Sequence, residues 1–264
     1  MAFKGKVAFV TGGASGMGRM TCERLAAQGA KVFAVDMEEN GLASLAEQNP
    51  NVTVQKCDVS NYEQVQDAVA RASKELGDID RLTHCAAIMP LDKIVDMSAE
   101  LIVRQMRINY EGTVYLTKSV LPGMLERNSG DIICFGSIAG EVPLPDCGGY
   151  CATKAAVNMY VKQMMYENKK SAIRFLLICP PPVNTSLLSE EKTGKKGFSE
   201  KEKAQALKTG VLVQPEFILD QIEKGIEKNK GVLFPGPAAK TIVTLHKFFP
   251  KTIGAMMANN KGLA

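Results

Sequence analysis

Short apolar segments rich in β-branched residues alternate along the chain with longer segments whose apolar residues recur at helical spacing. The short segments predict strands at Val7 to Val10, Lys31 to Val35, Val52 to Lys56, Leu82 to Cys85, Asp131 to Phe135, Arg174 to Cys179 and Val232 to Phe234. The longer segments predict helices at Met17 to Gln28, Gly41 to Gln48, Tyr62 to Leu76, Ala99 to Arg127, Tyr150 to Asn168 and Glu216 to Lys228. The alternation predicts one α/β domain over residues 1–264, a doubly wound parallel sheet of about seven strands flanked by helices on both faces.

Residues with special roles at helix ends support this assignment. Ser60, with Glu63 three residues later, has the spacing of a capping box and predicts the start of the third helix. Gly29 and Gly77 stand where the first and third helices are expected to end, because glycine readily adopts the conformation that closes a helix. No internal repeat or interdomain linker interrupts the pattern.

Composition and charge narrow the classes of function. The chain has 45% hydrophobic and 23% charged residues, which is ordinary for a globular protein and excludes intrinsic disorder. Its formal net charge of +4 is dispersed, whereas a nucleic-acid-binding protein needs a clustered basic face, so no nucleic-acid partner is expected. Neither a membrane-spanning apolar run nor a signal-peptide pattern stands in the sequence, which predicts a cytoplasmic protein.

Cysteine and histidine usage bears on metal and disulfide chemistry. The seven cysteines are odd in number and follow no Cys-x-x-Cys pattern, so reduced thiols are expected. Cys57, Cys134 and Cys179 lie in or beside apolar strands, where cysteine acts as a small buried hydrophobe. Because only His84 and His246 are available, far apart on segments of different type, no metal site is expected.

Two segments depart from the regular alternation. The Lys/Glu/Gly-rich stretch from Ser189 to Lys208 predicts a mobile insertion, a lid at about residues 186–209. An amphipathic helical tail is expected at about residues 237–260, with Lys240, Lys247 and Lys251 opposite or flanking the apolar residues Ile242, Leu245, Phe248, Phe249, Ile253, Met256 and Met257. The tail is expected to pack on its own domain or on a neighbouring subunit, and attachment to a membrane surface is the alternative.

A glycine-rich turn, Thr11 to Gly18, joins the first predicted strand to the first predicted helix. Gly12 allows a tight turn, Gly16 allows a pyrophosphate to approach the backbone, and Gly18 allows the helix to pack closely on the sheet. The N-terminus of the helix favours an anion through its unpaired N–H groups and its dipole. The turn therefore predicts a dinucleotide site that includes Gly12, Ser15, Gly16, Met17 and Gly18.

Asp36 ends the second predicted strand, eighteen residues after Gly18. That spacing is typical of an acidic residue that binds the hydroxyls of the adenosine ribose, and capping of the next helix is the other role open to it. A carboxylate here repels a ribose 2′-phosphate, and neither Ser15 nor Met37 offers a basic partner for one. NAD(H) is therefore expected in preference to NADP(H).

Tyr150 and Lys154 stand four residues apart on one face of a predicted helix, and Ser137 ends the preceding strand. These positions meet at the carboxyl edge of the sheet, where open α/β folds bind ligands. An ammonium at about 4 Å and an effective dielectric of about 20 stabilises a phenolate by up to about 4 kcal/mol, which lowers a phenol pKa by up to about three units. The pattern predicts that Tyr150 is a general acid/base, although a buried aromatic beside a solvated lysine is the alternative for the pair alone.

In the order and spacing of these motifs the sequence resembles the short-chain dehydrogenase/reductase family, from Lys6 to about Phe234. The resemblance is to the NAD-preferring subgroup with a Tyr-x-x-x-Lys active site, and it implies a Rossmann fold. It further implies that Tyr150 transfers the substrate proton, while Lys154 lowers the pKa of Tyr150 and holds the nicotinamide ribose. Ser137 would orient the substrate oxygen, and Asn109 would support a water relay to Lys154.

The same resemblance implies further cofactor contacts. Asp58 and Val59 would contact the adenine, and Val183 and Thr185 would hold the carboxamide. Met37, Cys85, Ala86, Ala87 and Pro180 complete the implied cofactor site.

The sequence departs from the family pattern in two places. The family's Asn-Asn-Ala-Gly is replaced by the sequence from His84 to Ala87, so the Asn side chains that tie this turn together are missing. We expect His84 to be structural rather than catalytic. The family's Pro-Gly is replaced by Pro180-Pro181, which stiffens the loop beside the nicotinamide.

These observations predict an NAD(H)-dependent oxidoreductase that interconverts a hydrophobic secondary alcohol and its ketone. The substrate is expected to contact Met89, Ser137, Val142, Leu144, Cys147, Tyr150, Leu187 and Leu188. A catalytically silent dinucleotide-binding sensor or scaffold of the same fold is the alternative. The changed turn after His84 favours that alternative, and the intact Ser137, Tyr150 and Lys154 argue against it.

Two long predicted helices, Ala99 to Arg127 and Tyr150 to Asn168, carry apolar residues around more of their circumference than one sheet face can cover. Val114, Leu121, Met159 and Met164 are examples. A self-complementary contact buries such a surplus, and the family pairs these helices across a two-fold axis. A homodimer or homotetramer is therefore expected.

Overall fold

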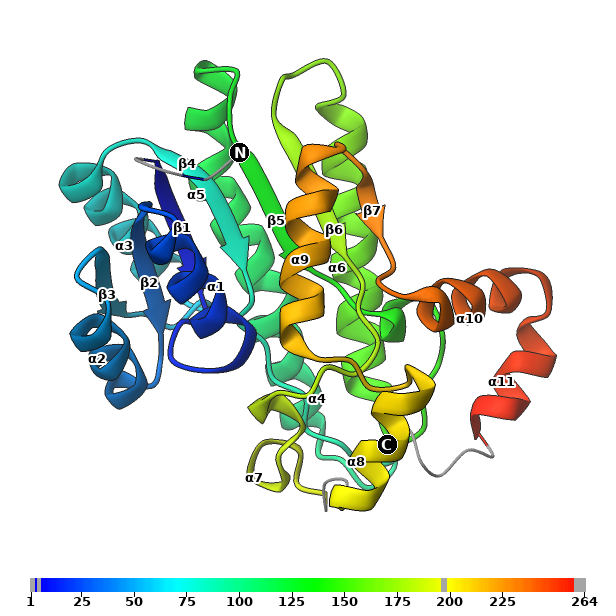
Figure 1. Cartoon of the computed structure of the whole chain (residues 1–264). Coiled ribbons are helices and arrows are strands. Elements are labelled where there is room, and N and C mark those ends of the chain that lie inside the picture. Colours follow the sequence, from blue (N-terminus) through cyan, green and yellow to red (C-terminus); the bar gives the residue numbers. More distant parts are fainter. Residues whose placement is uncertain (1–2, 4–5, 196–198, 259–264) are drawn as a thin grey trace.

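A single seven-stranded parallel sheet runs through the molecule in the order β3-β2-β1-β4-β5-β6-β7 (Figure 1). The computed structural model describes residues 3, 6–195 and 199–258. The strands are β1 Val7–Thr11, β2 Lys31–Asp36, β3 Val52–Lys56, β4 Ile79–His84, β5 Asp131–Phe135, β6 Arg174–Ile178 and β7 Gly231–Leu233. This arrangement confirms the predicted doubly wound α/β fold.

Helices cover both faces of the sheet, which explains why β1, β2, β5 and β6 are largely apolar. One face is covered by α1 (Gly16–Ala27), α2 (Glu39–Gln48) and α9 (Pro215–Glu227), and the other by α3 (Tyr62–Leu76), α5 (Gly112–Glu126) and α6 (Gly148–Glu167). Side chains alternate between the two cores, so Phe9 packs with the α3 side and Val10 with the α1 side. Among the described residues, no helix combines the length and apolar character needed to cross a bilayer.

The remaining helices lie around the carboxyl edge of the sheet or beyond its β7 end (Figure 1). They are α4 (Ala99–Met106), α7 (Glu190–Thr193), α8 (Glu200–Thr209), α10 (Pro237–Phe248) and α11 (Pro250–Ala258). Single 3₁₀ turns form at Ile138–Gly140 and Ser186–Leu188.

The third helix, α3, has the predicted bounds, but its predicted capping residue is wrong. The capping box of Ser60 and Glu63 does not form, because Asn61 caps α3 by accepting a hydrogen bond from the Gln64 N–H at 3.1 Å. Ser60 instead donates its hydroxyl to Asp58.

Two predicted helical segments, residues 99–127 and the tail at about residues 237–260, are divided. Residues 99–127 form α4 and α5 joined by one π-helical turn, Arg107–Glu111. The predicted tail is two helices, which break at Phe249 because the following proline cannot continue the hydrogen-bond ladder of α10. Within the predicted lid and tail, residues 196–198 and 259–260 lie outside the described residues.

A buried ion cluster ties together three strands at the amino edge of the sheet. Asp131 begins β5 and lies beside Arg81 of β4 and Arg174 of β6. Its two carboxylate oxygens accept from these guanidinium groups at 2.9 and 2.7 Å. Arg81 also pairs with Glu223 of α9 at 2.8 Å, so the cluster connects the sheet to a covering helix. Arg81 and Asp131 are buried, and each depends on the other for compensation of its charge.

We therefore expect Asp131→Ala to lower the free energy of unfolding by about 3 to 5 kcal/mol, because the variant leaves Arg81 buried without its main counter-charge. Urea unfolding followed by circular dichroism measures the effect. Asp220→Ala is the matched control, since Asp220 pairs with Arg24 at 2.6 Å but is 56% exposed. The control should cost less than about 1 kcal/mol. Equal losses in the two variants would contradict the importance of the buried cluster.

Candidate active site

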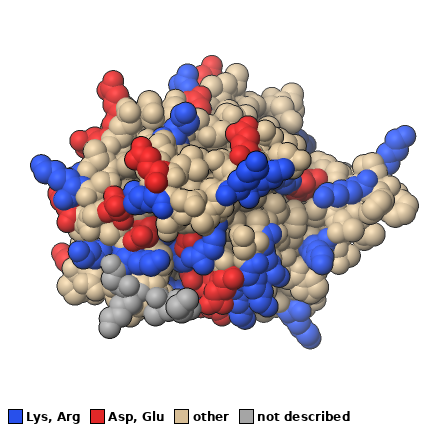
Figure 2. Space-filling view, turned by 90° about the horizontal axis from the view of Figure 1, so that it is seen from above, with Lys and Arg blue, Asp and Glu red and all other residues tan. Residues whose placement is uncertain are grey.

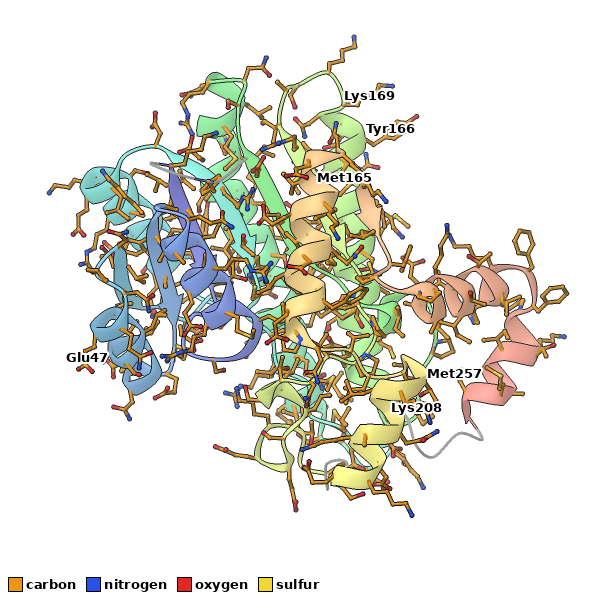
Figure 3. The ribbon with its side chains drawn as sticks, viewed as in Figure 1. Glu47, Met165, Tyr166, Lys169, Lys208 and Met257 are labelled. Carbon is orange, nitrogen blue, oxygen red and sulfur yellow. The ribbon has the colours of Figure 1, made fainter. Side chains whose placement is uncertain are left out.

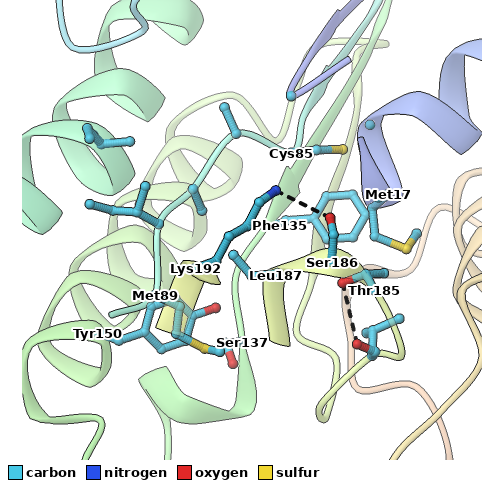
Figure 4. A pocket seen from close by; sticks show the side chains of 18 of the residues that line it. Met17, Cys85, Met89, Phe135, Ser137, Tyr150, Thr185, Ser186, Leu187 and Lys192 are labelled. Atoms are coloured by element: carbon cyan, nitrogen blue, oxygen red, sulfur yellow. Dashed lines mark hydrogen bonds between the residues drawn. The ribbon is translucent and has the colours of Figure 1, made fainter. Parts of the chain in front are cut away.

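A cavity of about 900 Å³ opens at the carboxyl edge of the sheet, between the glycine-rich turn and the segment after β6 (Figure 4). The strand order reverses at β1, which has β2 on one side and β4 on the other. Such a switch point leaves a crevice that open α/β folds use for ligands.

Nearly all of the site residues predicted from the sequence line this cavity. They are Gly12, Ser15, Gly16, Met17, Gly18, Asp36, Met37, Asp58, Val59, Cys85, Ala86, Ala87, Met89, Ser137, Leu144, Cys147, Tyr150, Lys154, Pro180, Val183, Thr185, Leu187 and Leu188. Val142 was wrongly predicted to line the substrate pocket, because it is buried in a cluster with residues of α10 and α11. Asn109 is buried behind the cavity wall.

The glycine-rich turn has the backbone geometry that its glycines predict. Gly12 and Gly16 have φ values of +73° and +54°, which L-residues with a side chain rarely adopt. At Gly18 a Cβ atom would lie 2.0 Å from the carbonyl oxygen of Gly12, so only glycine fits. The turn brings the N-terminus of α1 to the cavity with its backbone close to any ligand.

Asp36 fixes the turn to the end of β2. Its carboxylate accepts hydrogen bonds from the backbone N–H groups of Ala14, Met37 and Glu38, at 3.1, 2.7 and 3.1 Å. Glu38, rather than Asp36, caps α2 by accepting from the N–H groups of Asn40 and Gly41. Asp36 thus has a fixed orientation at the cavity wall.

The turn after β4 is tied by Thr11 in place of the missing Asn side chains. The Thr11 hydroxyl oxygen accepts from the N–H groups of Cys85 and Ala86, both at 3.1 Å. It lies 2.8 Å from Nδ1 of His84, and with two N–H donors already on the oxygen, the hydroxyl proton is donated to His84. Burial, together with the charge of Lys154, lowers the pKa of His84 to about 3, so the ring is neutral.

Tyr150 and Lys154 are held rigidly by α6 and by the end of β5. The Lys154 ammonium donates to the carbonyl oxygen of Phe135 at 2.7 Å and lies 5.6 Å from the centre of the Tyr150 ring. Tyr150 and Ser137 both project into the cavity near Met89 (Figure 4). All three polar side chains are buried, with at most 8% of their surface exposed.

The predicted lowering of the Tyr150 pKa is wrong for this geometry. Burial raises the pKa of Tyr150 well above its usual value, and the nearby Ser137 hydroxyl offsets only part of that rise. Burial also lowers the pKa of Lys154 to about 8. The thiols of Cys85, Cys134 and Cys179 near Lys154 have pKa values raised to about 12 by burial, so they are neutral and provide no counter-charge.

Asn109 lies in the π-helical turn and supports the wall of the cavity. Its carboxamide oxygen accepts from the Ile88 N–H at 2.9 Å, and its amide group donates to the Ile88 carbonyl and the Thr153 hydroxyl, both at 3.0 Å. The side chain therefore joins the segment after β4 to α6, next to Lys154. Its part in a water relay stays a prediction.

The sequence patterns did not identify two polar residues of the segment after β6. Lys192 of α7 reaches across the cavity, with its ammonium 3.1 Å from the Ser15 hydroxyl and 3.3 Å from the Ser186 hydroxyl (Figure 4). The two hydroxyl oxygens are themselves 3.3 Å apart. Lys192 stands in a run of charged residues that carries no motif, so its contact with Ser15 had no signal in the sequence.

Comparisons with known proteins agree with this arrangement. The family described as short chain dehydrogenase matches residues 6–196. An uncharacterized oxidoreductase of Staphylococcus saprophyticus is 34% identical over 207 residues, which cover 76% of this chain and 88% of the relative. The 2-(S)-hydroxypropyl-CoM dehydrogenase 3 of Xanthobacter autotrophicus is 32% identical over 196 residues, which cover 72% of this chain and 76% of that enzyme. A short chain dehydrogenase/reductase of Burkholderia phymatum, crystallised with NAD, shares the fold with a TM-score of 0.82 and 24% identity over 96% of both chains.

The neutral, buried His84 predicts a loss of stability in acid. Because its pKa of about 3 lies below the usual value of 6.5, the unfolded chain takes up the proton first as the pH falls below 6.5. At pH 5 this difference in pKa lowers the free energy of unfolding by about 2 kcal/mol. The His84→Asn variant should not show this decrease. Urea unfolding at pH 7 and pH 5 measures the difference, with His246→Asn as the control. Identical pH dependence in the His84→Asn protein and the wild type would contradict the assignment.

Proposed function

Since the chain belongs to the short chain dehydrogenase family, we propose that it is an NAD(H)-dependent oxidoreductase that interconverts a hydrophobic secondary alcohol and its ketone. The single observation that carries the proposal is the position of Tyr150 and Ser137. Their hydroxyl groups lie at the apolar part of the same cavity whose other end is the glycine-rich turn. A dinucleotide on that turn extends toward a substrate held at Tyr150.

The residues present fit a nicotinamide dinucleotide. The N-terminus of α1 suits the pyrophosphate. At Gly16 the absence of a side chain leaves room between the turn and the segment after β6, since Thr185 and Ser186 lie within 4 Å of the Cβ position. Asp36 would hold the adenosine ribose, and Lys154 the nicotinamide ribose. When bound, the nicotinamide ring supplies the acceptor or donor of a hydride.

The chain's own residues handle the proton. During reduction of a ketone, the Tyr150 phenol gives its proton to the substrate oxygen, and the Ser137 hydroxyl donates a hydrogen bond to the same oxygen. Burial raises the pKa of Tyr150, so the phenol keeps its proton at neutral pH, and this is the form that reduction requires. During oxidation of an alcohol, Tyr150 must first lose that proton, and the Lys154 ammonium, 5.6 Å from the centre of the Tyr150 ring, would have to turn from the Phe135 carbonyl to stabilise the resulting phenolate.

An apolar wall beside Tyr150 sets the substrate class. The side chains that pack with Tyr150 are Met89, Leu91, Ala139, Leu144, Cys147, Cys151, Leu187 and Leu188. Such a lining gains about 0.8 kcal/mol for each buried CH₂ group and leaves the hydroxyls of a sugar without partners. The Xanthobacter relative is by name a dehydrogenase of a 2-hydroxypropyl compound, which agrees with chemistry at a secondary alcohol.

We also propose that the protein is a homodimer or homotetramer in the cytoplasm. Met159 of α6 is 66% exposed, and Leu121 lines a surface cleft of about 310 Å³ between α5 and α6. Met164, which is expected on the same outer surface, also lines this cleft but is only 5% exposed and packs in the core. The face between α5 and α6 thus keeps part of the predicted apolar surplus.

The proposed activity predicts that kcat/KM rises with chain length in a homologous series of 2-alkanols or 2-alkanones, followed by NADH absorbance. Each added CH₂ that enters the apolar part of the cavity should increase kcat/KM by about threefold to fourfold. A preference for sugars or short polyols would contradict the substrate class.

The same assay separates the enzyme from the silent alternative. Tyr150→Phe should abolish turnover and leave NADH affinity nearly unchanged, because it removes the proton donor and little volume. Tyr166→Phe is the control, since Tyr166 is 71% exposed on α6. Tight NADH binding by the wild type, with no turnover of any alcohol or ketone, would favour a sensor or scaffold.

Lys192 provides a second way to test the cofactor site. Its ammonium lies at Ser15 and Ser186, and Ser186 also borders the close-approach position Gly16. We propose that Lys192 pairs with the pyrophosphate and so links the lid to the bound cofactor. Another lid residue, Lys195, forms a different contact. Its ammonium pairs with the carboxylate of Asp92, on the segment after β4, at 2.9 Å.

Lys192→Gln should weaken binding of NADH and of ADP-ribose by about tenfold or more, because it removes a charge-assisted hydrogen bond. Binding of adenosine, which has no phosphate, should not change. Lys195→Gln is the matched control and should bind like the wild type. Titration by fluorescence or calorimetry measures all three ligands, and NADPH is added because Asp36 should make it the weaker cofactor. A loss confined to NADPH would place Lys192 at a 2′-phosphate and contradict the pyrophosphate assignment.

A further inference from the structure

The two C-terminal helices, α10 and α11, project from the β7 end of the molecule and have two distinct sides (Figure 1). On the inner side, Ala239, Val243, Ile253 and Met257 are buried against Ile138 and Val142. Figure 3 labels Met257 on the side of α11 that faces the rest of the molecule. The inner contacts fix both helices on their own domain.

The outer side of these helices carries large apolar side chains in contact with solvent. Phe248 is 74% exposed, Phe249 59%, Met256 48% and Leu245 39%. We refer to these four residues as the C-terminal apolar patch. Phe248 and Phe249 are adjacent at the joint between α10 and α11. Placing two phenylalanine rings in water is unfavourable, so the patch marks an interaction surface.

The charged residues of the C-terminal segment that carries the patch are all basic. The segment after Glu227 contains six lysines and no aspartate or glutamate. Lys240, Lys247 and Lys251 of this segment lie on α10 and α11 and are exposed. In Figure 2 the projecting end of the molecule on the right, where these helices lie, carries basic and uncharged side chains at its tip. A partner for this surface must therefore accept apolar rings and offer negative charge.

We propose that the C-terminal apolar patch docks on a lipid surface that contains anionic headgroups. The rings of Phe248 and Phe249 would enter the boundary between headgroups and acyl chains, and the three lysines would pair with lipid phosphates and carboxylates. A second copy of the chain suits the patch less well. In a two-fold contact each patch meets its own copy, so the lysines of both copies would come together without a carboxylate from this segment.

The docked face is connected to the wall of the substrate cavity. Leu144 packs both with the inner residues of α10 and α11 and with the residues around Tyr150. Docking would therefore hold the apolar part of the cavity close to the lipid. This consequence rests on the proposed function, whereas the docking itself does not.

Co-sedimentation of the full-length protein with vesicles tests the proposal. The wild type should sediment with phosphatidylcholine vesicles that contain about 30% phosphatidylserine, and more weakly with pure phosphatidylcholine or at high salt. Exchange of Lys240, Lys247 and Lys251 for glutamine should lower the partition coefficient by roughly 100-fold, from about 1 kcal/mol for each lysine. Phe248→Ser with Phe249→Ser should lower it by at least about tenfold.

A matched control replaces two exposed apolar residues elsewhere, Val95 at 86% and Tyr166 at 71%, by serine. This control should sediment like the wild type. Failure of the wild type to bind anionic vesicles, or equal binding to neutral ones, would overturn the proposal. So would light scattering in lipid-free buffer that shows a smaller oligomer for the Phe248/Phe249 variant, because the patch would then be a subunit interface. Cofactor binding by every variant reports that the fold is intact.

Discussion

The hydrogen bonds of the Thr11 hydroxyl connect the end of β1 to the end of β4 and to the turn that follows it. The strand order reverses at β1, so the chain must leave β1 and β4 in different directions and still form one cavity wall. The Thr11 oxygen accepts from two N–H groups of the turn after β4 and donates its proton to His84. That turn then lies directly over Gly12, whose lack of a side chain leaves only backbone contact with Ala86. The contact between the glycine-rich turn and the cavity wall formed by the segment after β4 depends on these hydrogen bonds.

Much of the fold could be predicted because its physical causes are local. Most strands contain a short apolar run because both of their faces are covered, and glycine is required where φ is positive or a Cβ atom cannot fit. Local rules were insufficient where two residues compete for one role, as when Asn61 rather than Ser60 caps α3. The local rules also predicted a lowered pKa for Tyr150, whereas burial raises it. The spacing of Tyr150 and Lys154 shows neither how deeply Tyr150 is buried nor that the Lys154 ammonium points to the Phe135 carbonyl. The contact of Lys192 with Ser15 spans 177 residues and depends on the tertiary fold.

Charge is distributed unevenly between the two edges of the sheet. At the amino edge, Asp131 receives two guanidinium groups and the charges are compensated within the protein. Around Lys154 near the carboxyl edge, the neighbouring titratable groups are neutral thiols and a neutral imidazole, so this cation has no carboxylate partner among them. A buried cation without a counter-charge attracts electron-rich groups such as ribose hydroxyls or a phenolate. The charges at the amino edge are therefore paired within the protein, whereas the charge of Lys154 near the carboxyl edge can interact with a ligand.

Few of the described side chains between Thr185 and Leu212 enter the core. α8 has no buried residue, and the polar contacts of Lys192 and Lys195 are made by side chains rather than by the packing of apolar surface. Substitutions in such a segment change the free energy of unfolding little. Under selection, this segment can acquire new side chains over the apolar wall while the sheet stays unchanged. Divergence of substrate range among close homologues should therefore be concentrated here, and a directed-evolution library limited to this segment would sample new specificities without many unfolded variants.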